Sequence, residues 1–152
     1  MRQSNSAKLF GVMTNSEILI STDKSLLDVE KIHLEIKSSY WGGYRSKALT
    51  QKTIDNSICY GVYQANEQIG FARVLTDEVV YAHIMDVIIF GNHKGRGIGK
   101  KLMDHIMADP KFQNVLTIGL KTKDAHSFYE RYGFTAIGDS VLWMTIDNAK
   151  LD

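Results

Sequence analysis

The sequence predicts a single α/β domain of the mixed α+β kind, in which a central, mostly antiparallel sheet is flanked by helices. Its 152 residues fit one domain, and no internal repeat or linker divides residues 1–152. Strand patterns and helix patterns follow one another in the order β-α-α-β-β-β-α-β-α-β. Because some strands are joined by short turns and others through helices, hairpins and crossovers must share one mixed sheet.

The element boundaries follow from apolar periodicity and from turn and capping residues. Ser25 begins a capping-box-like sequence, Pro110 reinforces a helix stop near Ala108, and Gly133 is a typical residue after a helix C-terminus. The turn at residues 65–67 predicts a hairpin. The expected strands are 17–22, 58–64, 68–76, 79–90, 115–120 and 134–146, the last with a break at residues 138–139. The expected helices are 25–40, 48–56, 98–108 and 124–132.

Composition excludes several classes of protein. The hydrophobic content of 44% and the charged content of 23% are ordinary for a soluble globular protein. A net charge of +1 gives no general attraction to nucleic acid or to an anionic membrane, and no apolar run approaches the roughly 18 residues of a membrane span. One cysteine, Cys59, cannot form an internal disulfide. We therefore expect a cytoplasmic protein that binds neither nucleic acid nor membrane.

A glycine cluster at the junction of a strand and a helix is the strongest functional signal. It follows the apolar strand at residues 84–90 and precedes a helical face that begins at Ile98. The first N–H groups of a helix lack internal partners, and glycine lets a ligand approach the backbone closely. The basic residues of this junction crowd the positive end of the helix dipole; they are Lys94, Arg96, Lys100 and Lys101. The pattern predicts an anion-binding loop, and the alternative is a glycine-rich turn with solvated lysines.

Two familiar phosphate motifs do not fit this loop. The Walker pattern needs a glycine at the place of Lys94 and a Ser or Thr after Lys100, and both are missing. The dinucleotide fingerprint would need a third glycine at Lys100 or Leu102.

The segment Lys94–Gly99 instead resembles the acetyl-coenzyme A signature of the GNAT superfamily of N-acetyltransferases, Gln/Arg-x-x-Gly-x-Gly/Ala, with a lysine at its first position. A second segment, residues 122–134, is similar to the superfamily's late motif, Asn-x-x-Ala-x-x-Leu-Tyr-x-x-x-Gly-Phe. Ala125, Tyr129, Gly133 and Phe134 match that motif, Phe128 replaces Leu, and Thr122 takes the place of Asn. The order of elements over residues 17–146 is also that of the superfamily, so the chain is identified as a member. Residues 40–46, 70–73 and 124–126 further resemble a bacterial subgroup of uncharacterised acetyltransferases.

The resemblance implies an acetyl-coenzyme A-dependent N-acetyltransferase with a GNAT-like domain. The acetyl group would pass to a primary amine by direct attack on the thioester, with coenzyme A as product. Backbone atoms of Val87, Ile88 and Ile89 would pair with the pantetheine arm as an added strand. The other residues expected to bind the coenzyme are Lys94, Gly95, Arg96, Gly97, Ile98, Gly99, Lys100, Thr122, His126 and Tyr129.

The chemistry requires a proton acceptor for the amine and a proton donor for the departing thiolate. A primary amine has a pKa near 10, by analogy with lysine at ~10.4, so a base must take its proton before it attacks. Tyr129 suits the donor role. Asp86, inside an apolar strand, is the candidate base, and the alternative is a structural Asp bonded to backbone or to Arg73. His83 is three residues from Asp86, so we expect it on the opposite strand face and expect no dyad.

The resemblance to the superfamily implies that the connection between the first two helices covers the acceptor amine. Its two glycines allow a tight path, and stacking and anion-pairing groups accompany them. Trp41 has the alternative role of a core anchor, and the two arginines have that of surface ion pairs. The expected substrate-binding residues are Trp41, Tyr44, Arg45 and Arg73. The acceptor stays open, and a homodimer is one option for the assembly.

Other chemistry finds little support. The five histidines show no metal-ligand spacing, so no metal is expected, and Cys59 fits a small core residue better than a nucleophile.

A non-catalytic module that senses acyl-coenzyme A is the main alternative to an acetyltransferase, and it would bind the coenzyme without consuming any amine. A nucleic-acid binder built on the glycine loop is the third hypothesis, and its affinity would fall steeply with salt.

Overall fold

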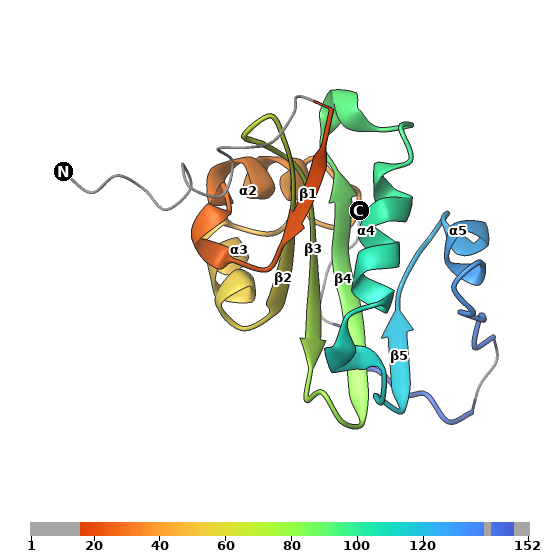
Figure 1. The fold of residues 1–152 in the computed structure, drawn as a ribbon. Coiled ribbons are helices and arrows are strands. Elements are labelled where there is room, and N and C mark those ends of the chain that lie inside the picture. Colours follow the sequence, from red (N-terminus) through yellow and green to blue (C-terminus); the bar gives the residue numbers. More distant parts are fainter. Residues whose placement is uncertain (1–15, 139–140, 148–152) are drawn as a thin grey trace.

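The computed structural model describes residues 16–138 and 141–147, and it confirms the predicted class of fold (Figure 1). Five strands form one sheet in the order β1-β2-β3-β4-β5. The strands are β1 (Ile18–Ser21), β2 (Ile58–Gln64), β3 (Glu67–Thr76), β4 (Tyr81–Ile89) and β5 (Thr117–Leu120). The α-helices are α2 (Val29–Lys37), α3 (Lys47–Asp55), α4 (Ile98–Met107) and α5 (His126–Glu130), and 3-10 turns occupy η1 (Lys24–Leu26), η2 (Gly91–His93) and η3 (Pro110–Phe112).

The sheet is mixed, as predicted. Strands β1 to β4 are antiparallel neighbours, whereas β5 runs parallel to β4 after the crossover through α4. The β2–β3 hairpin turns at Ala65 and Asn66, whose φ angles of 49° and 66° are those of the mirror-image turn that matches strand twist. At the β3–β4 turn, the Asp77 carboxylate accepts hydrogen bonds from the N–H groups of residues 79, 80 and 81.

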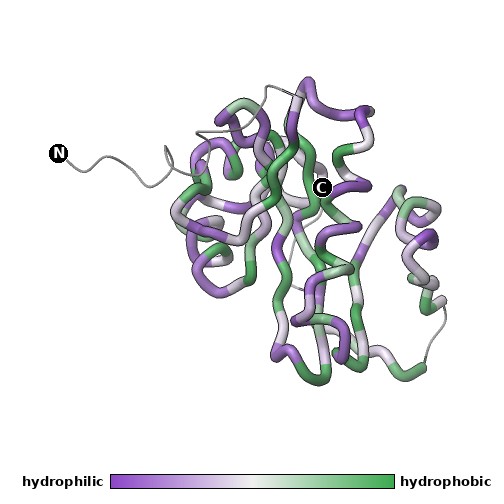
Figure 2. The backbone as a smooth tube through the Cα atoms, viewed as in Figure 1, coloured by the Kyte–Doolittle hydropathy of each residue, from purple (hydrophilic) through white to green (hydrophobic). Residues whose placement is uncertain are grey.

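Helices cover both faces of the sheet, because alternate strand residues pack into two separate cores. One core joins α4 to Tyr60 and Val62. The other joins α2 and α3 to Cys59 and Phe71, which point the opposite way. Figure 2 shows hydrophobic residues concentrated along the strands between these layers.

A bulge in β4 decides where its functional side chains point. Met85 pairs with Arg73 and Ile88 pairs with Phe71, so Asp86 and Val87 together lie opposite one residue, Ala72. Asp86 has a φ of 52°, in the left-handed region. The bulge interrupts the alternation of the strand, so Asp86 lies on the same face as Met85.

This bulge overturns one prediction about His83. His83 pairs with Leu75, which shares a strand face with Arg73, and the Asp86 carboxylate accepts a hydrogen bond from Arg73 Nε at 2.6 Å. His83 and Asp86 therefore lie on one face of the sheet. The prediction of opposite faces was wrong, because it assumed regular alternation through residue 86.

Two of the predicted elements differ most from the observed structure. The first helix begins at Val29 with Asp28 as its N-cap, since Ser25 belongs to the preceding 3-10 turn, and it ends at Lys37. The predicted strand at 134–146 is wrong for its described residues, 134–138 and 141–146, which form no strand. An alternating apolar pattern suits a strand, but a strand also needs a neighbouring strand with which to form hydrogen bonds. Here the ring centroids of Trp143 and Tyr81 are 6.1 Å apart, and the Asp147 carboxylate forms an ion pair with Lys121 Nζ at 3.3 Å.

Within the described residues, none of the helices combines the length and apolar character that a bilayer span requires.

Candidate active site

The N-terminus of α4 offers unsatisfied backbone donors. Its N-cap is Gly97 in the left-handed conformation (φ 74°), and no side chain caps the helix. The first intrahelical bond runs from the Lys101 N–H to the Gly97 carbonyl at 3.2 Å, so the N–H groups of residues 98 to 100 precede it. Gly95 has a φ of 76°, and a Cβ on it or on Gly97 would meet nothing within 4 Å. This end of α4 can hold an anion.

The cations of this loop differ in their surroundings. Lys94 is exposed, whereas Lys100 pairs with Asp104 one turn along the helix at 2.7 Å. The Arg96 guanidinium donates to Gln64 at the end of β2 and lies 3.0 Å from His93 Nδ1. Positive charge is therefore available beside the free N–H groups, and Asp104 partly neutralises that of Lys100.

Next to this loop, β4 continues beyond its pairing with β5. The parallel ladder ends where Ile84 meets Leu120, while β4 runs on to Ile89. Beyond the ladder, the chain that follows β5 diverges from β4 (Figure 1). Val87, Ile88 and Ile89 therefore lie on a stretch of β4 whose edge on the β5 side has no ladder partner among the described residues.

Helix α5 lies near the end of this unpaired edge, since a Cβ on Gly99 would lie 3.8 Å from Ile89 and 4.0 Å from Phe128. Tyr129 is partly buried and packs edge-on against Phe128 and Phe134. Burial, with a smaller contribution from Tyr40, raises the pKa of Tyr129 above 10, so its hydroxyl stays protonated at neutral pH. Tyr132, two residues after the end of α5, hydrogen-bonds to the Lys100 carbonyl and to Asp104 on α4.

The two remaining residues predicted on this side have distinct positions. The Thr122 hydroxyl accepts a hydrogen bond from the Ala125 N–H at 3.0 Å and so shapes the turn before α5. His126 is the exposed first residue of α5.

Asp86 joins two arginines in a buried cluster. Its carboxylate accepts from both terminal nitrogens of Arg45, at 2.5 and 3.2 Å, and from Arg73. The three side chains are only 3–7% exposed. The alternative of surface ion pairs for Arg45 and Arg73 is therefore wrong, because both guanidinium groups are buried. These contacts support the structural role for Asp86, since two cations already occupy its oxygens.

The connection between α2 and α3 lies against this cluster. Trp41 packs against the α2–α3 core and stacks on the Arg45 guanidinium at 5.8 Å, whereas Tyr44 is 53% exposed. Gly42 is required here, since a Cβ on it would lie 2.6 Å from Ile36 Cγ2. Tyr40 reaches the β5–α5 loop, where its hydroxyl accepts from the Lys123 N–H at 3.2 Å. The connection thus bridges the predicted acceptor side and the Tyr129 side.

Sequence reasoning set His83 aside, but the structure brings it to the same face as the Asp86 cluster. Its ring is half-buried and stacks on Tyr81, with Tyr81 Oη 3.1 Å from Nδ1. A histidine on the strand that leads into the glycine loop was the signal that could have identified it.

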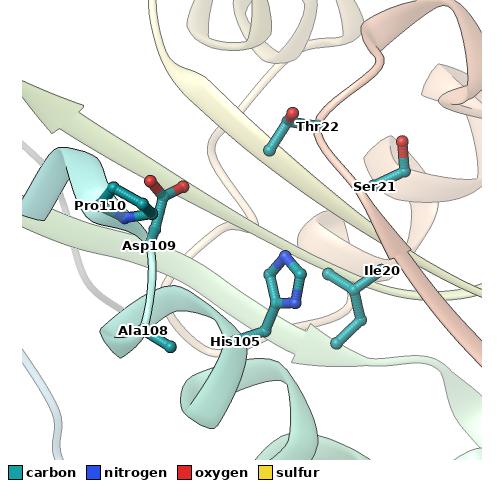
Figure 3. A pocket seen from close by; sticks show the side chains of 7 residues that line it. All are labelled: Ile20, Ser21, Thr22, His105, Ala108, Asp109 and Pro110. Carbon is teal, nitrogen blue, oxygen red and sulfur yellow. The ribbon is translucent and has the colours of Figure 1, made fainter.

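Other groups lie apart from this region. Burial raises the pKa of the Cys59 thiol to about 11, as expected for an unreactive core residue. A cavity of about 420 Å³ lies near the C-terminal end of α4, and none of the predicted site residues lines it (Figure 3). Among the described residues, no group of three or more His, Cys, Asp or Glu side chains could hold a metal ion.

Comparison with known proteins identifies the class. The family model of the acetyltransferase (GNAT) domain matches residues 55–136. A crystal structure assigned to GNAT acetyltransferases, from Xanthomonas campestris pv. campestris, is 37% identical, with a TM-score of 0.84 over 90% of this chain and 96% of that one. An uncharacterised N-acetyltransferase of Gracilaria tenuistipitata var. liui is 31% identical over 88% of this chain and 75% of its own length. A protein of Gibberella zeae assigned to acetyltransferases is 26% identical over 79% of this chain and 80% of its own.

The fold and the comparisons therefore define an acyltransferase. The chain belongs to the GNAT family and is an N-acetyltransferase, which confirms the resemblance found in the sequence. Family members named as N-acetyltransferases favour catalysis over the sensing alternative.

Proposed function

We propose that the protein transfers an acetyl group from acetyl-coenzyme A to a primary amine by direct attack on the thioester. One observation carries the proposal: β4 extends past the end of β5 beside the uncapped N-terminus of α4. The free edge of β4 supplies N–H and C=O groups for the amides of the pantetheine arm. The first turn of α4 supplies N–H groups for the pyrophosphate.

The coenzyme-binding roles follow from these positions. Backbone atoms of residues 87–89 pair with the arm, and the N–H groups of residues 95–99 hold the pyrophosphate. Lys94 and Arg96 add charge, and Lys100 contributes less because Asp104 pairs with it. Thr122 and His126 line the α5 side.

Tyr129 is the proposed proton donor. The amine gives up a proton to a base as its nitrogen bonds to the thioester carbonyl carbon, the carbon–sulfur bond breaks, and the sulfur takes the Tyr129 hydroxyl proton. Water then returns a proton to the phenolate. The raised pKa of Tyr129 keeps this proton in place until sulfur carries negative charge.

On the acceptor side, we assign Asp86 a positioning role. By holding Arg45 and Arg73, it fixes the α2–α3 connection over the bulge of β4. Trp41 and Tyr44 flank the acceptor amine. Because both guanidinium groups already donate hydrogen bonds to Asp86, Arg45 and Arg73 shape the site and do not bind a substrate carboxylate.

The test combines an activity screen with coenzyme binding. Purified protein is incubated with acetyl-coenzyme A and a panel of lysine methyl ester, spermidine, glucosamine and tryptamine, and free thiol is measured. Amine-dependent thiol release supports the proposal, whereas coenzyme binding with no release for any amine would favour the sensing alternative. A cytoplasmic location and a homodimer stay predictions, the latter tested by sedimentation velocity.

Gly97→Ala tests the coenzyme site itself. The added Cβ must stand in the left-handed region and in the path of the phosphate, so the Kd for coenzyme A, measured by calorimetry, should rise roughly tenfold. Gly138→Ala is the matched control, since Gly138 also has a positive φ (60°) and open space around it. Equal Kd values for the two variants would argue against phosphate binding at α4.

A further inference from the structure

His83 stands on a part of the sheet that the helices leave open. The α2–α3 core covers the half of this face around Phe71 and Phe90. His83 lies beyond that core, opposite Leu75, which is 50% exposed. Across the ladder lies Gly119, where a Cβ would come within 2.5 Å of Tyr81 Oη and 3.5 Å of His83 Nδ1. Glycine at 119 thus leaves room for both rings.

The position of His83 along β4 relates it to the proposed acetyl-transfer site. The β4–β5 ladder ends at residue 84, so Met85 is the first β4 residue beyond it, and His83 is two residues earlier on the same face. At about 3.3 Å per residue, this places His83 about 7 Å along the strand from the start of the unpaired edge. Because that separation exceeds hydrogen-bond reach, a proton passes from the amine to His83 through intervening water.

The surroundings of His83 keep its ring uncharged at neutral pH. Burial first, and then the positive charges of Lys121 and Arg73, hold the pKa of His83 below its ordinary value of 6.5. Acidic groups on this face have cationic partners: Asp86 accepts from Arg73 and Arg45, and Asp147 pairs with Lys121. The remaining titratable neighbour is Tyr81, in hydrogen-bond contact with Nδ1.

Resting on the proposed function, we propose that His83 is the general base, whose Nε2 accepts the proton that the acceptor amine loses as its nitrogen bonds to the acetyl carbon. In the tautomer required, Nδ1–H donates to Tyr81 Oη and leaves the Nε2 lone pair free. Tyr81 is then a positioning residue. The imidazolium formed releases its proton to water, so the ring is regenerated at each turnover.

His83→Gln, with His105→Gln as the control, tests this assignment. His105 is at the opposite end of α4, beside the cavity of Figure 3. The kcat of each protein is measured from pH 5.5 to 9 with the panel amine that wild type acetylates fastest, beside thermal unfolding and coenzyme A binding. We expect His83→Gln to lower kcat at least tenfold at pH 7, to lose the acid limb of the profile and to bind coenzyme A normally. His105→Gln should keep the wild-type profile.

A second variant covers the case in which glutamine disturbs the strand. In His83→Ala, added imidazole should restore part of the lost rate, which a purely structural histidine would not allow. An unchanged pH profile in His83→Gln, with wild-type thiol release intact, would overturn the role of His83 and leave the acetyl transfer standing. Absence of thiol release by wild type with every amine would overturn the proposed function and this inference with it.

Discussion

Asp86 combines a left-handed backbone with a carboxylate that is enclosed by two guanidinium groups. Aspartate and asparagine tolerate this backbone region better than most residues, because their short polar side chains bond locally. The same residue therefore makes the bulge and anchors the arginines that reach it from β3 and from the α2–α3 connection.

Asp86→Asn should destabilise the fold strongly. Asparagine keeps the shape and tolerates the backbone, but it leaves two buried guanidinium groups without an anion, so we expect a loss of about 3 kcal/mol or more in the free energy of unfolding. Urea unfolding measures this loss. Asp104→Asn, which breaks the exposed pair with Lys100, should cost less than about 1 kcal/mol. Undiminished stability with lost activity would instead support Asp86 as the base.

Tyr129→Phe should slow acetyl transfer without weakening coenzyme binding. Removing the hydroxyl takes away the proton donor for the thiolate while the ring keeps its contacts with Phe128 and Phe134, so kcat should fall roughly 100-fold. Steady-state thiol release gives kcat. Tyr132→Phe is the control: it loses the hydrogen bonds to α4, so stability should drop by about 1 kcal/mol while kcat changes little. Comparable kcat values for both variants would remove Tyr129 from the mechanism.

At the level of elements, the sequence predicted the parts that depend on local pattern. The β2–β3 hairpin, the long β4 strand, the glycine junction and α4 all lie where periodicity and turn residues placed them. Each depends on residues near one another in the chain, so a single sequence contains the necessary information.

Features that depend on distant partners were not predictable in this way. The bulge at Asp86 depends on the register between β3 and β4, and the burial of Arg45 depends on that bulge. The segment after Gly133 has strand-like residues, but strand formation also requires a free edge at the right place. The prediction that His83 and Asp86 lie on opposite strand faces was wrong for the same reason. Alternation of side chains along a strand is a local rule, and the register with the neighbouring strand can interrupt it.

Across the whole molecule, apolar surface is unevenly distributed. The interior holds residues such as Ile106 of α4, which is fully buried. In contrast, Val141, Leu142, Met144 and Ile146 are 88–92% exposed. The stability of the domain should therefore depend on the two cores and very little on residues 141–147.

Ile106→Ala and Ile146→Ala test this division with one chemical change. Truncating Ile106 leaves a cavity in the core and should cost about 2–5 kcal/mol, whereas truncating Ile146 should cost less than about 0.5 kcal/mol. Chemical denaturation at low protein concentration measures both. A loss above about 2 kcal/mol for Ile146→Ala would show that the segment is packed in solution.

Neighbouring glycines in the α2–α3 connection face very different restrictions. Gly42 abuts Ile36 so closely that even a methyl group has no room, while a Cβ on Gly43 would lie 3.8 Å from its nearest neighbour. In a saturation library selected for acetyl transfer, codon 42 should return glycine alone, and codon 43 should accept a broad range of amino acids. Backbone geometry thus fixes glycine at position 42, whereas position 43 can change without loss of the fold.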